Sequence, residues 1–186
     1  MFFNLFGKKD SPKGNEAVRD RVYISSEGKM NACIALAKDS PNYIFIGWFN
    51  KTVQLFKENF IKNGIEENRV FEAKHFNSSL LQNKTAIFLE HYPLHEKEAT
   101  FISNWEQNPI LIFSALDEPI FKMLGSEKMI PLIKMMGMKE DEAIEHNYVT
   151  QSIKRGQQKM AEKITFEKSA ESQEEWMRKN ISETSH

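Results

Sequence analysis

The stretch "MGMKEDEAIEH", residues 136–146, has the densest group of side chains that could do chemistry. Carboxylates and imidazole are both metal ligands and acid/base groups, so Glu142, Glu145 and His146 could form such a site. A metal site would need further ligands from elsewhere in the chain, and the sequence singles out none. We therefore predict no metal and no cofactor.

A structural role explains the same stretch better. Gly137 can end one helix and turn the chain, because glycine tolerates the left-handed conformation. Acidic residues suit the N-terminal end of a following helix, and His146 or Asn147 can cap it. We predict a hinge between two helices.

A second possible site is "EHYPLHEKE", in which His91 and His95 are four residues apart. Two histidines at this spacing on one helix can bind zinc. Pro93 lies between them, so we expect His91 to end a strand and His95 to open a helix, which removes that geometry. We predict a polar strand end. A small metal enzyme and a weak nucleotide contact are the alternatives, since ligands bind at strand ends in such sheets.

The sequence has no phosphate-binding loop of the kind that ATP hydrolysis needs. Such a loop is glycine-rich and ends in Lys-Ser/Thr, whereas Gly28 and Lys29 are followed by Met30. Tyr23 stands where the first glycine of the loop belongs. We predict that the protein is not an enzyme.

Composition narrows the function class. The chain has 186 residues, of which 40% are apolar, and this favours one domain with one core. With 25 Lys and Arg against 26 Asp and Glu, a nucleic-acid partner is not expected. Cys33 is the single cysteine, which excludes an internal disulfide and indicates a reducing, cytoplasmic location.

The first ten residues, "MFFNLFGKKD", do not have the order of a signal peptide, because the positive charges follow the apolar residues. No apolar run reaches the roughly 18 residues of a membrane span. The mixture of aromatic and basic residues could contact an anionic lipid surface, or the aromatics could fold back onto the domain. The predicted membrane contacts are Phe2, Phe3, Phe6, Lys8 and Lys9. Such contacts would place the protein peripherally at the inner face of the plasma membrane.

Strand-like and helix-like segments alternate through the first two thirds of the chain. The predicted strands are residues 21–24, 43–49, 69–74, 85–91 and 109–116, with helices between them. This alternation predicts an α/β fold with three layers, in which helices cover both faces of a mainly parallel sheet of about five strands. Short helices follow, and then one long helix that begins near Asn147.

We divide the chain into a short amphipathic start and linker (1–19), an α/β domain (20–165) and a charged tail (166–186). The tail has few apolar residues, so it is expected to be a solvated helix or a disordered segment.

Five methionines cluster in the short helices, and we expect most of them in the core and some at an interface. They are Met123, Met129, Met135, Met136 and Met138. Gly156, inside the long helix, could allow close approach by another chain.

Residues 113–163 resemble SecA, the motor ATPase of bacterial protein export, at the end of its second nucleotide-binding domain and the start of the next helix. The matching residues are Gly137, Met138, Glu142, Ile144, Glu145, His146, Val149, Thr150, Ile153, Gln157 and Lys159. A weaker resemblance covers "DRVYISSEGKMNACI" and the segment that ends in "EAKH", so the likeness spans about residues 20–163. It implies a RecA-like fold.

The family's glycine- and arginine-rich segments, whose arginines stabilise the transferring phosphate, have no counterpart here. The chain has no glycine between Gly64 and Gly125, and no arginine between Arg69 and Arg155. The resemblance therefore implies a shortened, degenerate and non-catalytic domain that acts by protein–protein contact. SecA or the Sec channel is the first partner expected. A nucleotide sensor without hydrolysis and a scaffold of an unrelated assembly are the alternatives.

The contact surface is expected on the helices of residues 117–163. Its predicted residues are Met135, Met136, Met138, Glu142, Glu145, His146, Lys154 and Arg155.

Overall fold

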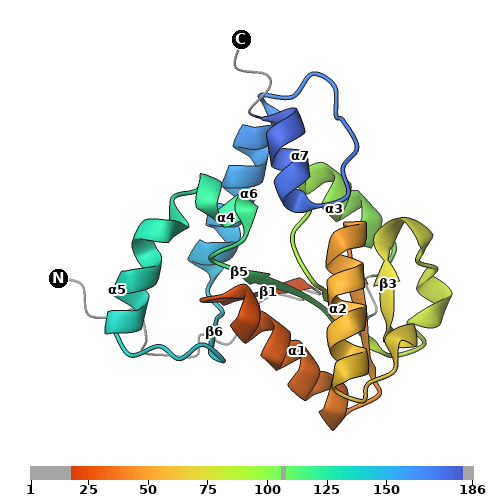
Figure 1. The fold of residues 1–186 in the computed structure, drawn as a ribbon. Helices are drawn as coiled ribbons and strands as arrows, with labels where there is room; N and C mark the ends of the chain where they lie inside the picture. The colour runs from red at the N-terminus through yellow and green to blue at the C-terminus, as the bar shows by residue number, and fades with distance from the viewer. Residues whose placement is uncertain (1–17, 106–107, 182–186) are drawn as a thin grey trace.

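The computed structural model describes residues 18–105 and 108–181. In this part of the chain, six strands form one sheet in the order β3-β2-β4-β5-β1-β6 (Figure 1). Neighbouring strands from β3 to β1 are parallel, and β6 is antiparallel to β1. The strands are β1 Val18–Tyr23, β2 Tyr43–Gly47, β3 Val70–Glu72, β4 Thr85–Phe88, β5 Ile110–Ala115 and β6 Ala143–Ile144. The predicted α/β class is confirmed.

The helices follow the predicted alternation. They are α1 Ser26–Asp39, α2 Asn50–Lys62, α3 His95–Ile102, α4 Pro119–Met123, α5 Met129–Met135, α6 Asn147–Ala161 and α7 Gln173–Asn180. Short 3-10 turns are η1 Glu67–Arg69, η2 Ala73–His75, η3 Ser78–Leu80, η4 Ser103–Trp105 and η5 Ser126–Lys128. The helix expected after Asn147 ends at Ala161.

The sheet is the middle layer of three, with helices and turns on its two faces. The side chains of β2 show this, because successive residues of a strand point to opposite faces. Phe45 packs with residues of α1 and α2 on one face. Ile44 and Ile46 pack on the other face, beneath α3 and the short turns. A central strand buried on both faces requires a nearly continuous apolar sequence, as "YIFIG" provides.

A third apolar cluster lies beyond the carboxyl ends of the strands, where α4, α6 and α7 meet (Figure 1). It includes Ile120 of α4, Ile153 and Met160 of α6, and Trp176 of α7. Trp176 is 1% exposed. The expectation of a solvated or disordered tail is therefore wrong for residues 173–181, because the apolar side of α7 completes this core.

A local signal for α7 was present in the sequence. Ser172 accepts a hydrogen bond from the backbone N–H of Glu175 (3.1 Å), and Glu175 accepts one from the backbone of Glu171 (2.8 Å). A serine followed three residues later by a glutamate is the sequence pattern of a capping box, although here the glutamate binds the residue before the cap.

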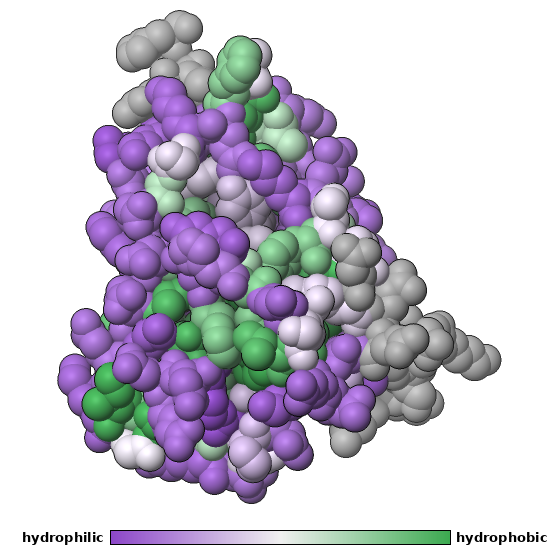
Figure 2. All heavy atoms as spheres, turned by 90° about the vertical axis from the view of Figure 1, so that its right-hand side faces the viewer, coloured by the Kyte–Doolittle hydropathy of each residue, from purple (hydrophilic) through white to green (hydrophobic). Residues whose placement is uncertain are grey.

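The surface seen in Figure 2 shows the side of the molecule that bears α3 and β3. It is mainly hydrophilic, with apolar residues gathered between the hydrophilic ones.

Candidate functional site

The stretch of residues 136–146 connects two helices, as predicted, and also adds a strand to the sheet. Gly137 has a φ of 87°, which ends α5 and turns the chain. Ala143 and Ile144 then pair with Tyr23 and Val22 of β1 as the edge strand β6. This strand was not predicted, because two residues carry no periodic pattern.

His146 caps α6, as one of the two predicted options. Its ring nitrogen Nδ1 accepts a hydrogen bond from the backbone N–H of Tyr148 (3.2 Å), and the two rings stack. The imidazole is therefore engaged locally.

Three of the acidic side chains of this stretch, Glu140, Glu142 and Glu145, have separate structural partners. Glu140 accepts a hydrogen bond from the Ser25 hydroxyl (2.5 Å) and pairs with Lys134 (2.6 Å). Hydrogen bonds from Lys134 and Ser25 lower the pKa of Glu140. Glu145 pairs with Arg21 (2.7 Å). Within residues 18–105 and 108–181, no group of three or more His, Cys, Asp or Glu side chains could hold a metal ion.

Glu142 accepts a hydrogen bond from the backbone N–H of Lys139 (3.0 Å) within its own loop. The loop is packed tightly on α1. A Cβ atom added to Gly28 would meet the backbone carbonyl of Glu140.

The N-terminus of α1 is already occupied by acceptors from this chain. Ser25 caps the helix by accepting a hydrogen bond from Gly28 (3.1 Å). The carboxylate of Asp117 accepts hydrogen bonds from the backbone N–H (2.8 and 3.0 Å) and hydroxyl (2.7 Å) of Ser26. A helix N-terminus is a favourable place for a phosphate, but here Asp117 binds the N–H of Ser26 and Ser25 binds the N–H of Gly28.

A buried ionic group lies at the carboxyl ends of the parallel strands, where ligands bind in such sheets. The ammonium group of Lys29 donates hydrogen bonds to Glu118 and to the carbonyl of Leu89. Glu90 accepts hydrogen bonds from Trp48 and Phe49 N–H groups (3.2 Å each).

The electrostatics of this group follow from its burial. Burial lowers the pKa of Lys29, but the charges of Glu118 and Glu90 outweigh burial and raise it above the usual value. Burial, with a contribution from Glu118, raises the pKa of Glu90 to about 7. A cavity of about 170 Å³ lies beside Lys29, Glu90 and Glu118, and α7 supplies part of its wall through Gln173 and Glu174.

His91 is the centre of a second buried group. Its Nδ1 lies 3.1 Å from Glu98 and its Nε2 lies 3.4 Å from Asp20. Burial lowers the pKa of His91, but Glu98 and Asp20 outweigh burial and raise it to about 9. The imidazole thus lies between two carboxylates, which favour its protonated form.

The same group ties three helices to the strand end. Gln157 of α6 donates to the carbonyl of Tyr92 (2.7 Å), and Gln173 of α7 donates to the carbonyl of His91 (3.0 Å). His95 begins α3, as predicted, and is separated from His91 by the turn. The prediction of a polar strand end missed that His91, Glu90 and Glu98 are 4% exposed or less. Charged residues directly after a buried strand, as in "IFLEH", were the available signal.

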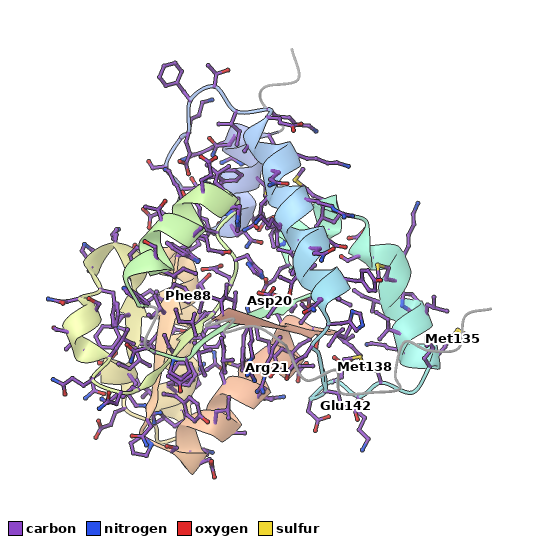
Figure 3. All side chains as sticks on the ribbon, turned by 180° about the vertical axis from the view of Figure 1, so that it is seen from behind. Asp20, Arg21, Phe88, Met135, Met138 and Glu142 are labelled. Atoms are coloured by element: carbon purple, nitrogen blue, oxygen red, sulfur yellow. The ribbon has the colours of Figure 1, made fainter. Side chains whose placement is uncertain are left out.

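The methionine cluster is mostly on the surface. Met123, Met129, Met135 and Met136 are between 43% and 85% exposed, so the expectation that most belong to the core is wrong. Met138 is partly buried and packs on the third apolar cluster. Figure 3 shows Met135 at the edge of the molecule, with Met138 closer to the sheet.

The other predicted contact residues lie on the same helical part. Glu142, Glu145, His146, Lys154 and Arg155 are all exposed. Gly156 was expected to allow the approach of another chain, but the side chain of Leu124 packs against it instead. A Cβ atom there would lie 2.7 Å from Cδ2 of Leu124.

The five predicted membrane contacts, Phe2, Phe3, Phe6, Lys8 and Lys9, lie outside the described residues. In the part of the chain that the structure describes, no helix is long and apolar enough to span a membrane.

Comparison with known proteins finds similarity to SecA over about a quarter of the chain. The protein translocase subunit SecA of Acidithiobacillus ferrooxidans is 44% identical over 48 residues, which are 26% of this chain and 5% of that protein. SecA of Ehrlichia canis is 38% identical over 48 residues, which are 26% of this chain and 6% of that protein. SecA of Chlorobium phaeobacteroides is 35% identical over 52 residues, which are 28% of this chain and 5% of that protein.

The matched stretch is therefore a small fraction of each curated relative. No family model matches the chain. A segment of about a quarter of this chain is similar in sequence to SecA proteins.

Proposed function

We propose that this protein is a non-catalytic domain, derived from the second nucleotide-binding domain of SecA, that acts by protein–protein contact in protein export. The observation that supports this most directly is the similarity to SecA proteins of several bacteria. SecA or the Sec channel is the first partner to test.

The geometry of the strand ends supports a non-catalytic role. At the start of α1 the backbone N–H of Ser26 donates to Asp117. The buried strand ends carry Glu90 and Glu118 beside a single ammonium group from Lys29. Phosphate groups need a surplus of donors and positive charge. This edge instead has a surplus of acceptors, so it disfavours a nucleotide.

The exposed methionines support a role in contact. Met135 and Met136 are 85% and 55% exposed, at the end of α5. Methionine is flexible and polarizable, and it is over-used on surfaces that adapt to a partner. Large exposed apolar side chains that gather on one element also mark interaction sites.

The experiment is a pull-down with tagged full-length protein from a lysate of its native source. The wild type is compared with the Met135→Asp/Met136→Asp double variant, which changes two exposed side chains and leaves the core intact. Leu55→Asp/Ile61→Asp on α2 is the matched control, since those side chains are 52% and 57% exposed. We expect SecA or its channel to be recovered by the wild type and the control, and to be lost with the α5 variant.

Recovery of an unrelated assembly, with neither SecA nor the channel, would overturn the link to export. Calorimetry with ATP and ADP at millimolar concentration tests the non-catalytic part. Heat of binding, or release of phosphate, would contradict it.

A further inference from the structure

A small cavity lies between α1, α2, the start of α4 and the start of α7. Its volume is about 170 Å³, below the roughly 300–1,000 Å³ of pockets that hold drug-sized ligands. Ser26, Leu55 and Glu174 form part of its wall and are exposed, so the cavity opens to solvent. It therefore has the size for a small molecule or for a single side chain.

The wall of this cavity has an apolar part and a charged part. The apolar part is made by Met30, Leu55, Phe56 and Pro119, and an alkyl chain placed there is removed from water, which is favourable. The charged part is made by Lys29, Glu90 and Glu118. These three residues are 4%, 4% and 7% exposed. The cavity thus joins an apolar surface to a buried group of charges.

One acceptor in the charged part has no partner. Oε1 of Glu118 pairs with the ammonium group of Lys29, whereas Oε2 is buried and forms no hydrogen bond with the residues that the structure describes. A buried carboxylate oxygen without a donor is unfavourable. The carboxylate of Glu90, by contrast, accepts hydrogen bonds from backbone N–H groups and from the Thr52 hydroxyl. Oε2 of Glu118 is therefore the acceptor that is open to a donor from outside the chain.

The charged part also has one carboxylate more than it has cations. Glu90 and Glu118 act on the same ammonium group, that of Lys29. The nearest other cation, the His91 imidazole, lies between two carboxylates of its own. One negative charge inside the cavity is therefore not compensated by the protein.

The surface hollow that adjoins the cavity at Glu174 does not supply the compensating charge, because its own acids and bases nearly balance. Its charged residues are Lys51, Glu171, Glu174, Glu175, Arg178 and, paired with Glu175, Lys179. The excess of negative charge thus belongs to the interior of the cavity.

The pKa of Glu90 reflects this excess. Burial raises the pKa to about 7, Lys29 opposes the rise and Glu118 adds to it. Glu90 therefore binds a proton near neutral pH, and the proton neutralises the same charge that a bound cation would neutralise. A cationic ligand and this proton should compete.

We propose that the cavity binds a primary alkylammonium group. The ammonium head donates a hydrogen bond to Oε2 of Glu118, and the alkyl chain lies on Met30, Leu55 and Phe56. A free small amine and a lysine side chain of another protein present the same chemistry to this site. The cavity is formed by α1, α2, α4 and α7, so the inference goes beyond the proposed function and does not depend on the contact residues of α5.

An ammonium head suits this cavity better than a metal ion, an anion or a hydroxyl group does. Ca²⁺ takes about 6–8 oxygen ligands, and in the described part of the chain no group of three His, Cys, Asp or Glu side chains could hold a metal ion. An anion would be repelled by Glu90 and Glu118. A neutral hydroxyl group would fill the space without compensating the charge.

The test is an NMR titration of the ¹⁵N-labelled full chain, followed through the backbone amide signals of Met30, Thr52 and Leu55. The amine probes are n-butylammonium chloride and the blocked peptide acetyl-Gly-Lys-Gly-amide. The comparison probes are 1-butanol and sodium butyrate, which have a neutral or a negative head on a similar chain, and magnesium chloride. At pH 8 we expect an amine to shift these signals with millimolar affinity, and butanol and butyrate to bind at least about tenfold more weakly.

The two amine probes distinguish the source of the ligand. Tighter binding of the peptide identifies a protein side chain, and tighter binding of butylammonium identifies a free amine.

Two variants assign the effect to the buried carboxylate. Glu118→Gln keeps the size of the side chain and removes its charge, so it should weaken the binding of butylammonium at least about tenfold. Glu174→Gln removes an exposed charge from the same wall and is the matched control. It should change the affinity by less than about twofold, because an exposed charge is screened by solvent and salt.

A measurement on the wild type keeps the test valid if Glu118→Gln, which alters a buried ion pair, does not fold. The affinity for butylammonium should rise by up to about tenfold from pH 6 to pH 8, because Glu90 loses its proton over this range.

Several results would overturn the proposal. They are an equal response to butanol, tighter binding of butyrate, a response to magnesium alone, and no response to either amine at millimolar concentration. An affinity that does not change between pH 6 and pH 8, or that is the same for Glu118→Gln and the wild type, would overturn it as well. None of these results bears on the pull-down, which reports on α5.

Discussion

Lys29 of α1 and Glu118, which directly precedes α4, form an ion pair in the interior, with side chains 5% and 8% exposed. Their sequence positions are 89 residues apart. The pair joins α1 to the chain that follows β5, at the edge where ligands bind in such sheets.

Breaking this pair should destabilise the protein strongly. Glu118→Leu leaves the ammonium group of Lys29 buried without its carboxylate, and removal of one partner of a buried pair typically costs about 3–5 kcal/mol. The Lys29→Met/Glu118→Leu double variant should recover most of that loss, because the ammonium group is removed together with its partner carboxylate. Urea unfolding monitored by circular dichroism measures both; a double variant no more stable than Glu118→Leu would contradict the argument.

Stability should fall as pH rises from about 5 to about 9.5. The folded-state pKa of Glu90 is raised from the ordinary carboxyl range to about 7, and that of His91 from the imidazole range to about 9. A raised pKa means that the folded state holds the proton more tightly, so its contribution is complete below the unfolded pKa and is lost as pH passes the folded pKa. The midpoint of urea unfolding at pH 5, 7 and 9.5 measures this.

The Glu90→Gln variant identifies the source of the lower part of that dependence. It should flatten the change between pH 5 and pH 7 and leave the loss near pH 9. A midpoint that rises with pH in the wild type would show that other groups dominate.

Gly28→Ala should lower the stability of the protein, because it forces the loop of residues 139–142 away from α1. The new methyl group would meet the backbone carbonyl of Glu140, and overpacking against a backbone typically costs about 1–3 kcal/mol. Asn31→Ala, at an exposed position of the same helix, is the control and should change stability by less than about 0.5 kcal/mol. Thermal unfolding of the two variants compares them; equal stability would mean that the loop moves freely.

Trp176→Ala should show that α7 is part of the folded core. The side chain is 1% exposed, and its ring N–H donates to Glu167 (2.8 Å). Loss of a fully buried tryptophan typically costs about 3–5 kcal/mol. Phe166→Ala, at a position that is 87% exposed, should have little effect. If urea unfolding gives the same stability for Trp176→Ala and the wild type, the tail is solvated, as its composition predicted.

The parallel strands and the long helices could be predicted from the sequence because their signals are local. "YIFIG" has the apolar run of a strand buried on both faces, and Ser25 provides a helix cap. Gly137 indicated the turn after α5, and His146 the start of α6. The SecA resemblance came from an ordered set of residues in the same helical part.

The sequence by itself determined the α/β class, the order of the parallel strands and the lack of a phosphate-binding loop, because periodicity, caps and glycines act within a few residues. Only the tertiary structure decided that His91 and Glu90 are buried, that Trp176 closes a core and that Met135 faces solvent. Those properties depend on which surfaces meet. The pKa of His91 is raised because Asp20 comes from a strand distant in sequence and Glu98 of α3 is brought back to the ring by the turn after His91. A methionine stays exposed when Ile133, on the other side of the same helix, faces the core.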